Sequence, residues 1–338
     1  MTGPAASAPI AVLGSGSWGT ALAIQFARAG SAVRLWGRDA AHQAALAHDR
    51  RNLRYLPDAE FPAALEIASD LNDAVHGAAY ILVAVPSHGF RETLAAVAGH
   101  RDHGQRIAWA TKGFEIDTGL LPHQVAQQVL GAGISIAVLS GPTFARELGQ
   151  GLPTAITVAS PDPVFAAEIA QDLSSPNFRA YISSDYIGVE VGGAVKNVLA
   201  VGAGLCDGLH FGANTRMALI TRGLNEMVRL GVALGAQRET FMGLAGFGDL
   251  VLTCTDNQSR NRRFGLLLAT GLTPQQALQE IGQVVEGYQA ARALQGVAER
   301  LAVEMPICSG IFRILYEGGD AGDVVRGLMS RPIKAEFD

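Results

Sequence analysis

The chain has little charge, few aromatic residues and few cysteines. Only 17% of its 338 residues are charged, 7% are aromatic, and the formal net charge is -5. Nucleic-acid binding depends on clustered Lys and Arg that replace phosphate counterions, so we expect no nucleic-acid partner. The three cysteines, Cys206, Cys254 and Cys308, form neither a closely spaced pair nor an even set. We therefore predict reduced thiols in a cytoplasmic protein, not a disulfide framework.

Long apolar runs and metal-binding clusters are also missing. The most apolar segment, residues 191–206, falls short of the roughly 20 residues that span a bilayer and carries Lys196 in its middle. It predicts a buried helix without membrane insertion. Residues 1–9 do not resemble a secretory signal and are expected to form a short disordered leader. The closely spaced histidines lack surrounding cysteines or carboxylates, so no metal site is expected.

The chain does have the length and pattern of a two-domain α/β protein. Short β-type runs alternate with helical patterns up to about residue 183, which predicts a doubly wound, mostly parallel sheet over residues 1–184. Residues 185–338 are expected to form an all-α domain. The predicted strands cover residues 10–13, 32–36, 80–85, 106–111, 135–139, 155–159 and 178–182. The main predicted helices cover residues 18–29, 164–173, 186–206, 215–234, 263–269, 274–281 and 287–301.

A glycine-rich motif, GSGSWG, follows the first predicted strand directly and opens a helical run. This is the context of a Rossmann dinucleotide-binding fingerprint. Gly14 would permit the tight turn, Gly16 the approach of the pyrophosphate, and Gly19 the packing of the helix on the strand. Arg38, beyond the second strand, could pair with a ribose 2′-phosphate. It therefore favours NADP over NAD, although it could instead be an ordinary solvated arginine.

Polar residues after later strands mark a crevice at the carboxyl edge of the sheet. Lys112 is a candidate ligand for an anion or a carbonyl group, and Thr143 begins a short helix, predicted over residues 143–148, that could line the same crevice. Each has an ordinary alternative, a solvated lysine and a capped turn. Together they predict a ligand between the two domains.

The second domain carries the strongest catalytic signal. Lys196 interrupts an apolar, glycine-marked helix, and burial lowers the pKa of a lysine towards the range useful for acid–base chemistry. Snorkelling of the side chain to solvent is the alternative. Asp249 lies in a glycine-rich turn from which it could orient this lysine. The SRNRR cluster at residues 259–263, ahead of a helix, offers donors suited to a phosphate monoester, or else is a solvated helix start.

With these motifs in order, the chain resembles the bacterial type of NAD(P)-dependent glycerol-3-phosphate dehydrogenase. The resemblance rests on GSGSWGTALA, LWGRD, VAVPSH, WATKGFE, LSGPTFARE, GGAVKNVLAVGAG, GFGDLVLTCTDNQSRNRRFG, VVEG and EMPI. It implies a Rossmann domain followed by a helical domain like the C-terminal part of 6-phosphogluconate dehydrogenase. It also implies reduction of dihydroxyacetone phosphate to sn-glycerol 3-phosphate for glycerophospholipid synthesis. The residues alone indicate only a small phosphorylated substrate.

The resemblance also implies roles for individual residues. Lys196 would donate and accept the proton, and Lys112 and Arg260 would contact both substrate and cofactor. The remaining substrate residues would be Gly141, Thr143, Asp249, Ser259 and Asn261. The remaining cofactor residues would be Gly14, Gly16, Ser17, Trp18, Gly19, Arg38, Ala145, Val284 and Glu286.

Two other readings of the residues stay open. A β-hydroxyacid or ketopantoate-type reductase would share the two domains and the helix lysine, but its carboxylate substrate would need the SRNRR cluster less directly. A module that senses NAD(P)H without catalysis would not need a lysine embedded in apolar sequence. A homodimer is possible on either reading.

Overall fold

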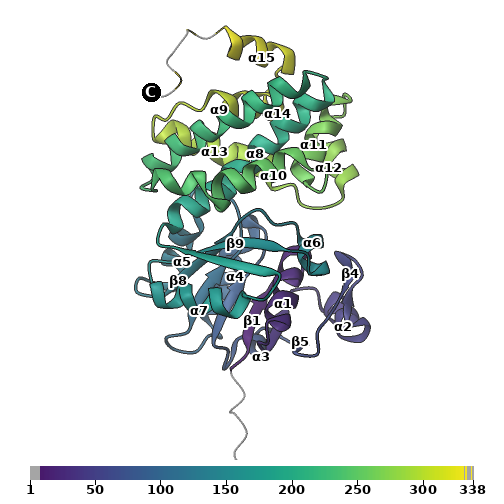
Figure 1. Cartoon of the computed structure of the whole chain (residues 1–338), viewed down its shortest axis with the longest axis vertical. Coiled ribbons are helices and arrows are strands. Elements are labelled where there is room, and N and C mark those ends of the chain that lie inside the picture. The colour runs from purple at the N-terminus through teal and green to yellow at the C-terminus, as the bar shows by residue number, and fades with distance from the viewer. Residues whose placement is uncertain (1–7, 331, 333–335, 337–338) are drawn as a thin grey trace, which may run out of the picture.

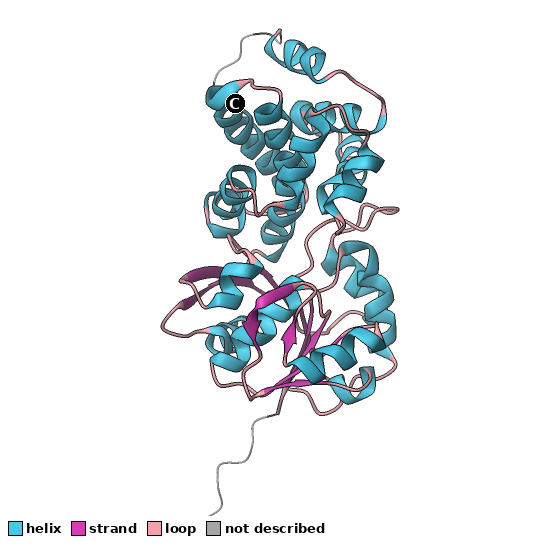
Figure 2. Ribbon diagram, turned by 90° about the vertical axis from the view of Figure 1, so that its right-hand side faces the viewer, coloured by secondary structure: helices cyan, strands magenta, loops and turns pink. Residues whose placement is uncertain are grey.

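The computed structural model describes residues 8–330, 332 and 336. A sheet domain forms the lower part of the molecule in Figure 1 and a bundle of helices the upper part, and Figure 2 shows the same two layers from the side. Residues 1–7 of the expected leader lie outside the described residues. The predicted combination of a doubly wound sheet and a helical domain is confirmed.

The sheet has eight strands in the order β10-β9-β8-β7-β6-β1-β2-β5. All neighbours pair in parallel except β8 and β9, which are antiparallel. Strands β1 and β6 are buried along their whole length because helices cover both faces of the sheet. The strands are β1 (Ile10–Leu13), β2 (Val33–Trp36), β5 (Leu65–Ile67), β6 (Tyr80–Val83), β7 (Arg106–Trp109), β8 (Ile136–Ser140), β9 (Thr154–Ala159) and β10 (Phe178–Ser183).

The chain runs from β1 towards β2 on one side and returns to β6 on the other, so the strand order reverses beside β1. Loops that leave the carboxyl ends of β1 and β6 diverge there and open the crevice in which such sheets bind ligands. The sheet domain's helices are α1 (Ser17–Arg28), α2 (Ala40–Asp49), α3 (Leu71–Val75), η1 (Ser87–Gly89), α4 (Phe90–Ala98), α5 (Pro122–Leu130), α6 (Ala145–Gln150) and α7 (Pro163–Leu173).

Three strands were not predicted. Strand β5 has only three residues, and β3 (Arg51–Asn52) and β4 (Leu56–Glu60) form a separate antiparallel ribbon. The sequence of β4, LPDAE, holds a proline and two acidic residues and shows no strand periodicity. It is ordered by packing instead, since Leu56 and Ala59 lie against Gly149 of α6.

The helical domain is arranged around α8 (Tyr186–Gly208). Helix α11 begins at Arg260, three residues earlier than predicted, because Ser259 caps it by accepting from the amide of Arg262 at 3.2 Å. Helices α10, α14 and α15 were not predicted. The other elements are α9 (Gly212–Ala233), η2 (Arg238–Met242), η3 (Leu244–Gly248), α10 (Asp249–Thr255), α11 (Arg260–Ala269), α12 (Pro274–Ile281), α13 (Glu286–Arg300), α14 (Pro306–Tyr316) and α15 (Ala321–Met329).

Helix α8 begins at residue 186, as predicted, and extends two residues beyond the predicted end at residue 206. Its 23 residues have the length and hydropathy of a membrane span. The expectation that residues 191–206 mark a segment too short to cross a bilayer was therefore wrong. The whole of its apolar window is nevertheless buried inside the protein, as the prediction of a buried helix required. Glycines along α8 allow close packing: a side chain at Gly204 would collide with the backbone of α11 at Arg262.

A buried carboxylate ties α8 to the sheet domain. Glu190 accepts from the indole Nε1 of Trp109 at the end of β7 (3.0 Å) and from the amide of His123 in α5 (2.9 Å). The His123 ring lies 2.5 Å from the other carboxylate oxygen. Burial raises the pKa of Glu190, while His123 and Trp109 oppose that rise. These contacts set the position of α8 relative to the strand that leads to Lys112.

Candidate active site

The glycine-rich loop joins β1 to α1 at the carboxyl edge of the sheet. Gly14 has a φ of 120°, and a side chain there would lie 2.5 Å from the carbonyl oxygen of Ala84. A side chain at Gly19 would collide with the carbonyl oxygen of Gly14. Gly16, the N-cap of α1, faces open space. The backbone at Gly16 is therefore open at the N-terminus of α1, where the unpaired amides of a helix attract an anion.

Trp18 connects this loop with the rest of the site. Its ring lies 5.9 Å from the ammonium nitrogen of Lys112. Its indole Nε1 is buried and has no hydrogen-bond partner among the described residues. Buried donors are normally paired, so an unpaired one beside an open anion site fits a ligand that spans the loop and the crevice. The loop and Trp18 thus have the features that a dinucleotide requires.

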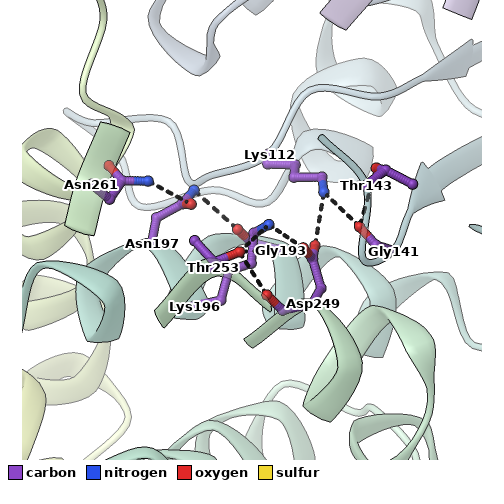
Figure 3. A network of polar contacts seen from close by, with 9 residues as sticks. All are labelled: Lys112, Gly141, Thr143, Gly193, Lys196, Asn197, Asp249, Thr253 and Asn261. Atoms are coloured by element: carbon purple, nitrogen blue, oxygen red, sulfur yellow. Dashed lines mark hydrogen bonds and ion pairs between the residues drawn. The ribbon is translucent and has the colours of Figure 1, made fainter. Parts of the chain in front are cut away.

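Three charged side chains meet where the two domains face each other (Figure 3). Asp249 accepts from the Nζ of Lys196 at 2.5 Å through Oδ1 and from the Nζ of Lys112 at 2.8 Å through Oδ2. The side chain of Asp249 is 1% exposed and that of Lys196 is 8% exposed. Lys112 comes from the loop after β7, while Lys196 and Asp249 belong to the helical domain. One carboxylate therefore holds two ammonium groups from opposite sides of the crevice.

Burial and charge act on these groups in opposite directions. Removal from water lowers the pKa of Lys196 to about 7; the negative charge of Asp249 opposes the shift and the charge of Lys112 adds to it. Burial alone would raise the pKa of Asp249, but the charges of Lys112 and Lys196 hold it below its ordinary value. Lys196 is thus able to give or take a proton near neutral pH, and Asp249 stays ionised.

Local structure explains how these side chains reach one another. A side chain at Gly192 of α8 would collide with the carbonyl oxygen of Ala245, and one at Gly193 would lie 3.3 Å from Cγ of Lys112. The small residues let α8 approach both the Lys112 loop and η3. Asp249 was expected in a glycine-rich turn, but it is the first residue of α10 after the π-helical turn η3. The glycines that indicated an irregular turn lie instead in a π-helical turn, a wide helical turn that is common at functional sites.

Two polar residues of the site were missed from the sequence. Thr253 lies one turn after Asp249 in α10, and its hydroxyl oxygen lies 3.1 Å from the Nζ of Lys196. Asn197 follows Lys196 and accepts from the Nδ2 of Asn261 at 2.9 Å (Figure 3). The spacing of four from Asp249 to Thr253 placed both on one helix face and was the available signal. This spacing had no meaning as long as Asp249 was expected to lie in a turn, because it places two residues on one face only within a helix.

The segment after β8 supplies the opposite wall. The carbonyl oxygen of Gly141 lies 3.4 Å from the Nζ of Lys112 and 3.3 Å from the hydroxyl of Thr143. A side chain at Gly141 would lie 3.1 Å from Cα of Ile156 in β9, so the close approach of the strands favours glycine there. The helix expected to begin at Thr143 begins at Ala145 instead. The structure therefore brings Gly141 and Thr143 to the Lys112–Asp249 pair.

The start of α11 forms another side of the site. Asn261 is buried, donates to Asn197, and accepts from the amide of Gly287 at 2.8 Å. Within the described part of the chain its amide nitrogen donates only to Asn197, so the second N–H group is available to a ligand. Arg260 is half-buried, and desolvation lowers its pKa while the nearby carboxylate of Glu286 opposes the shift. Arg260 and Asn261 thus form a donor pair at a helix N-terminus.

The SRNRR cluster does not act as one positive patch. Arg262 points into the helical domain, where it pairs with Asp207 at 2.5 Å and donates to the carbonyl oxygen of Cys254 at 3.1 Å. Arg263 is exposed on the other side of the helix. The expectation of a cluster facing a phosphate is corrected for these two residues, because helical geometry directs successive side chains to different faces.

The remaining predicted cofactor residues lie around the crevice. Arg38 follows β2 at the surface and pairs with Glu92 at 2.7 Å; its side chain is 62% exposed. Glu286 begins α13 and accepts from the hydroxyl of Ser87 at 2.9 Å, which joins the two domains. Val284 lies just ahead of α13, and Ala145 begins α6. Arg38 is the predicted residue that lies at the outer edge of the group.

Comparison with known proteins agrees with this architecture. Residues 9–166 match the model of the N-terminus of NAD-dependent glycerol-3-phosphate dehydrogenase, and residues 185–326 match that of its C-terminus. The chain is 56% identical over 328 residues to glycerol-3-phosphate dehydrogenase [NAD(P)+] of Aeromonas salmonicida, covering 97% of this chain and 98% of that protein. It is 54% identical over 333 residues to the Klebsiella pneumoniae protein of the same name, covering 98% of each.

Solved structures give the same result. The crystal structure of glycerol-3-phosphate dehydrogenase from Coxiella burnetii has a TM-score of 0.92 and 45% identity, covering 96% of this chain and 99% of that one. A ketopantoate reductase from Ralstonia eutropha has a TM-score of 0.59 at 15% identity, which shows a shared fold only. Since both family models match and the relatives are similar along nearly their whole length, the chain belongs to the NAD-dependent glycerol-3-phosphate dehydrogenase family.

Proposed function

We propose that this protein reduces dihydroxyacetone phosphate to sn-glycerol 3-phosphate with NAD(P)H, reversibly, and so supplies the backbone of glycerophospholipids. The observation that carries the proposal is the buried ammonium group of Lys196, held by Asp249 together with Lys112, whose ammonium group lies 5.9 Å from the ring of Trp18 in the glycine-rich motif. A ketone reductase needs a proton donor of near-neutral pKa beside a dinucleotide, and this arrangement provides both.

The residues of the site have separate tasks in this reaction. NAD(P)H held by the glycine-rich loop would supply the hydride that reduces the carbonyl carbon. Lys196, as ammonium, donates its proton to the carbonyl oxygen, and in the reverse direction neutral Lys196 accepts the hydroxyl proton. The charge of Lys112 stabilises negative charge on that oxygen, and Asp249 orients both lysines. The hydroxyl of Thr253, beside the same carboxylate oxygen, accepts a second hydrogen bond from Lys196 and limits the motion of its side chain.

The cofactor site combines the glycine-rich loop with residues across the crevice. The amides near Gly16 and Ser17 would hold the pyrophosphate. Arg38 would exchange its exposed pair with Glu92 for a ribose 2′-phosphate, which makes NADP the preferred cofactor and NAD the alternative. The other proposed contacts are Gly14, Trp18, Gly19, Lys112, Ala145, Arg260, Val284 and Glu286.

The substrate phosphate is proposed to lie at the start of α11. Ser259 shapes this end of the helix, and Arg260 and Asn261 supply donors. Gly141 and Thr143 would contact the substrate from the sheet domain. A phosphate held there positions the carbonyl group between Lys112 and Lys196 and converts binding energy into orientation.

Arg260→Ala is expected to lower kcat/KM for dihydroxyacetone phosphate about 10- to 100-fold, because a charge-assisted hydrogen bond to the phosphate is lost. At saturating NADPH, where the proposed cofactor contact of Arg260 does not limit the rate, activity with unphosphorylated dihydroxyacetone should fall much less, so discrimination between the two ketones falls. Steady-state rates with both ketones measure this. Arg263→Ala, an exposed arginine of the same helix, is the matched control and should retain full discrimination. Unchanged discrimination in the Arg260 variant would contradict the phosphate site.

Initial rates of the purified protein test the activity itself. We expect rapid oxidation of NADPH with dihydroxyacetone phosphate, a slower or weaker reaction with NADH, and production of the sn-3 isomer. Turnover of ketopantoate or a β-keto acid in its place would support the reductase alternative. Binding of NADPH without turnover of any ketone phosphate would support a sensing module.

Cellular location and assembly complete the proposal. The three cysteines Cys206, Cys254 and Cys308 are free and buried, as in proteins of a reducing compartment, so we place the enzyme in the cytoplasm. We expect no insertion into membranes and no nucleic-acid partner. A homodimer is the candidate assembly, and sedimentation or light scattering would determine it.

A further inference from the structure

The β3–β4 ribbon places one buried polar side chain against the glycine-rich loop. Asn52 in β3 is fully buried, although its neighbours Leu53 and Arg54 are exposed. Asparagine is uncommon in strands and is costly to bury unless its amide is paired. Its position in a short peripheral ribbon therefore needs a reason other than the stability of the ribbon.

Every polar group of Asn52 has a partner, and two of the partners belong to the loop and its helix. Nδ2 donates to the carbonyl oxygen of Ser15 at 2.9 Å and to the hydroxyl oxygen of Thr20 at 2.8 Å. Oδ1 accepts from the amide of Tyr55 at 3.1 Å, which fixes the orientation of the amide plane. Asn52 thus bridges the loop and the first turns of α1.

The carbonyl group of Ser15 determines the direction of a backbone amide in the glycine-rich loop. It lies between Gly14 and Gly16, and its orientation decides which way the following amide faces, because the peptide group is planar. The ring of His42 is a second neighbour of this oxygen but lies farther away, at 3.4 Å. Asn52 is consequently the main group that holds the Ser15–Gly16 peptide with its N–H towards the crevice.

We propose that Asn52 is a positioning residue for the cofactor: it holds the Ser15–Thr20 segment in the conformation that receives the dinucleotide pyrophosphate. The inference rests on the proposed cofactor site and extends it to a residue that does not touch the ligand. It also gives the β3–β4 ribbon a task, which is to present Asn52 beneath the loop. Preorganisation of this kind affects cofactor affinity and leaves the proton transfer at Lys196 untouched.

The test compares Asn52→Ala and Asn52→Asp with the wild type and with Asn72→Ala, an exposed asparagine of α3. NADPH affinity is measured by calorimetry, and KM and kcat by initial rates. We expect the dissociation constant and the KM for NADPH to rise about tenfold or more in both Asn52 variants. The aspartate should be the weaker binder because its oxygens repel the Ser15 carbonyl. The kcat at saturating NADPH and the KM for dihydroxyacetone phosphate should change less than about threefold.

The outcomes separate this inference from the proposed function. Wild-type affinity for NADPH in folded Asn52 variants would overturn the inference and leave the function standing. A fall in kcat without a change in NADPH affinity would overturn it as well. If the wild type itself bound no NADPH, both would fall. Should the Asn52 variants not fold, Thr20→Val is the second test, because it removes the hydroxyl that accepts from Asn52. Unchanged NADPH affinity of that folded variant would overturn the inference.

Discussion

Lys196→Ala is expected to reduce kcat for dihydroxyacetone phosphate reduction about 100- to 10,000-fold, with much smaller changes in both KM values. The variant loses the group that protonates the carbonyl oxygen, while the glycine-rich loop and the start of α11 stay intact. Rapid-quench or steady-state rates at saturating substrates measure the effect. Lys196→Met keeps the volume of the buried side chain and controls for a packing defect. Near-wild-type turnover of the folded alanine variant would exclude Lys196 as the proton donor.

The pH dependence provides a second readout of the same group. Reduction requires the ammonium form, and burial lowers the pKa of Lys196 to about 7. The rate of reduction should therefore fall as the pH rises through about 7, while the rate of oxidation, which needs the neutral amine, should rise over the same range. The Lys196 variants should lack both limbs. A reduction profile that stays flat from pH 6 to about 9 in the wild type would contradict the assignment.

Asp249→Asn is expected to affect both stability and activity. The substitution leaves the ammonium groups of Lys112 and Lys196 facing each other without the intervening charge, and breaking such a buried pair costs about 3–5 kcal/mol of unfolding free energy. It also removes the charge that opposes the lowered pKa of Lys196, so the alkaline limb of reduction should move to lower pH. Urea unfolding and pH–rate profiles measure the two effects. A limb at the wild-type position would show that Asp249 does not control Lys196.

Acid should reduce the difference in unfolding free energy between Asp249→Asn and the wild type. The pKa of Asp249 in the folded state lies below its ordinary value of 3.8, so its contribution to stability is present above that pH and is lost as the pH falls through the folded-state pKa. Asp117→Asn, at an exposed aspartate, is the matched control and should unfold like the wild type. Equal stability of Asp249→Asn and the wild type at neutral pH would contradict the bridging role.

The central strands and the long helices were predictable because local pattern and tertiary environment agree there. Strands β1 and β6 are short apolar runs bounded by turn residues, and their burial on both faces gives such runs. Helix α12 was predicted at its observed bounds, since Thr273 and Gln276 form a capping box and Gly282 ends the helix. The β3–β4 ribbon was missed because its order depends on packing against α6, which is distant in the sequence.

In the candidate site, too, single residues were predictable from the sequence, but the contacts between them were not. Lys112, Lys196 and Asp249 were singled out from motif context, but nothing local showed that one carboxylate would hold both lysines. Thr253 and Asn197 were overlooked because their contribution depends on which helix face meets the crevice. Arg262 was counted in the SRNRR cluster, and nothing local showed that it would turn inward to pair with Asp207 of a different helix.

The amino-acid sequence by itself determined the class of fold and the presence of a dinucleotide loop. Those features depend on short-range periodicity and on the steric needs of single glycines such as Gly14. The tertiary structure alone decided the Lys112–Asp249–Lys196 arrangement, the inward turn of Arg262 and the support of Ser15 by Asn52. These contacts join residues from separate elements, and their energies come from burial, hydrogen bonding and charge pairing that exist only after those elements have packed against one another.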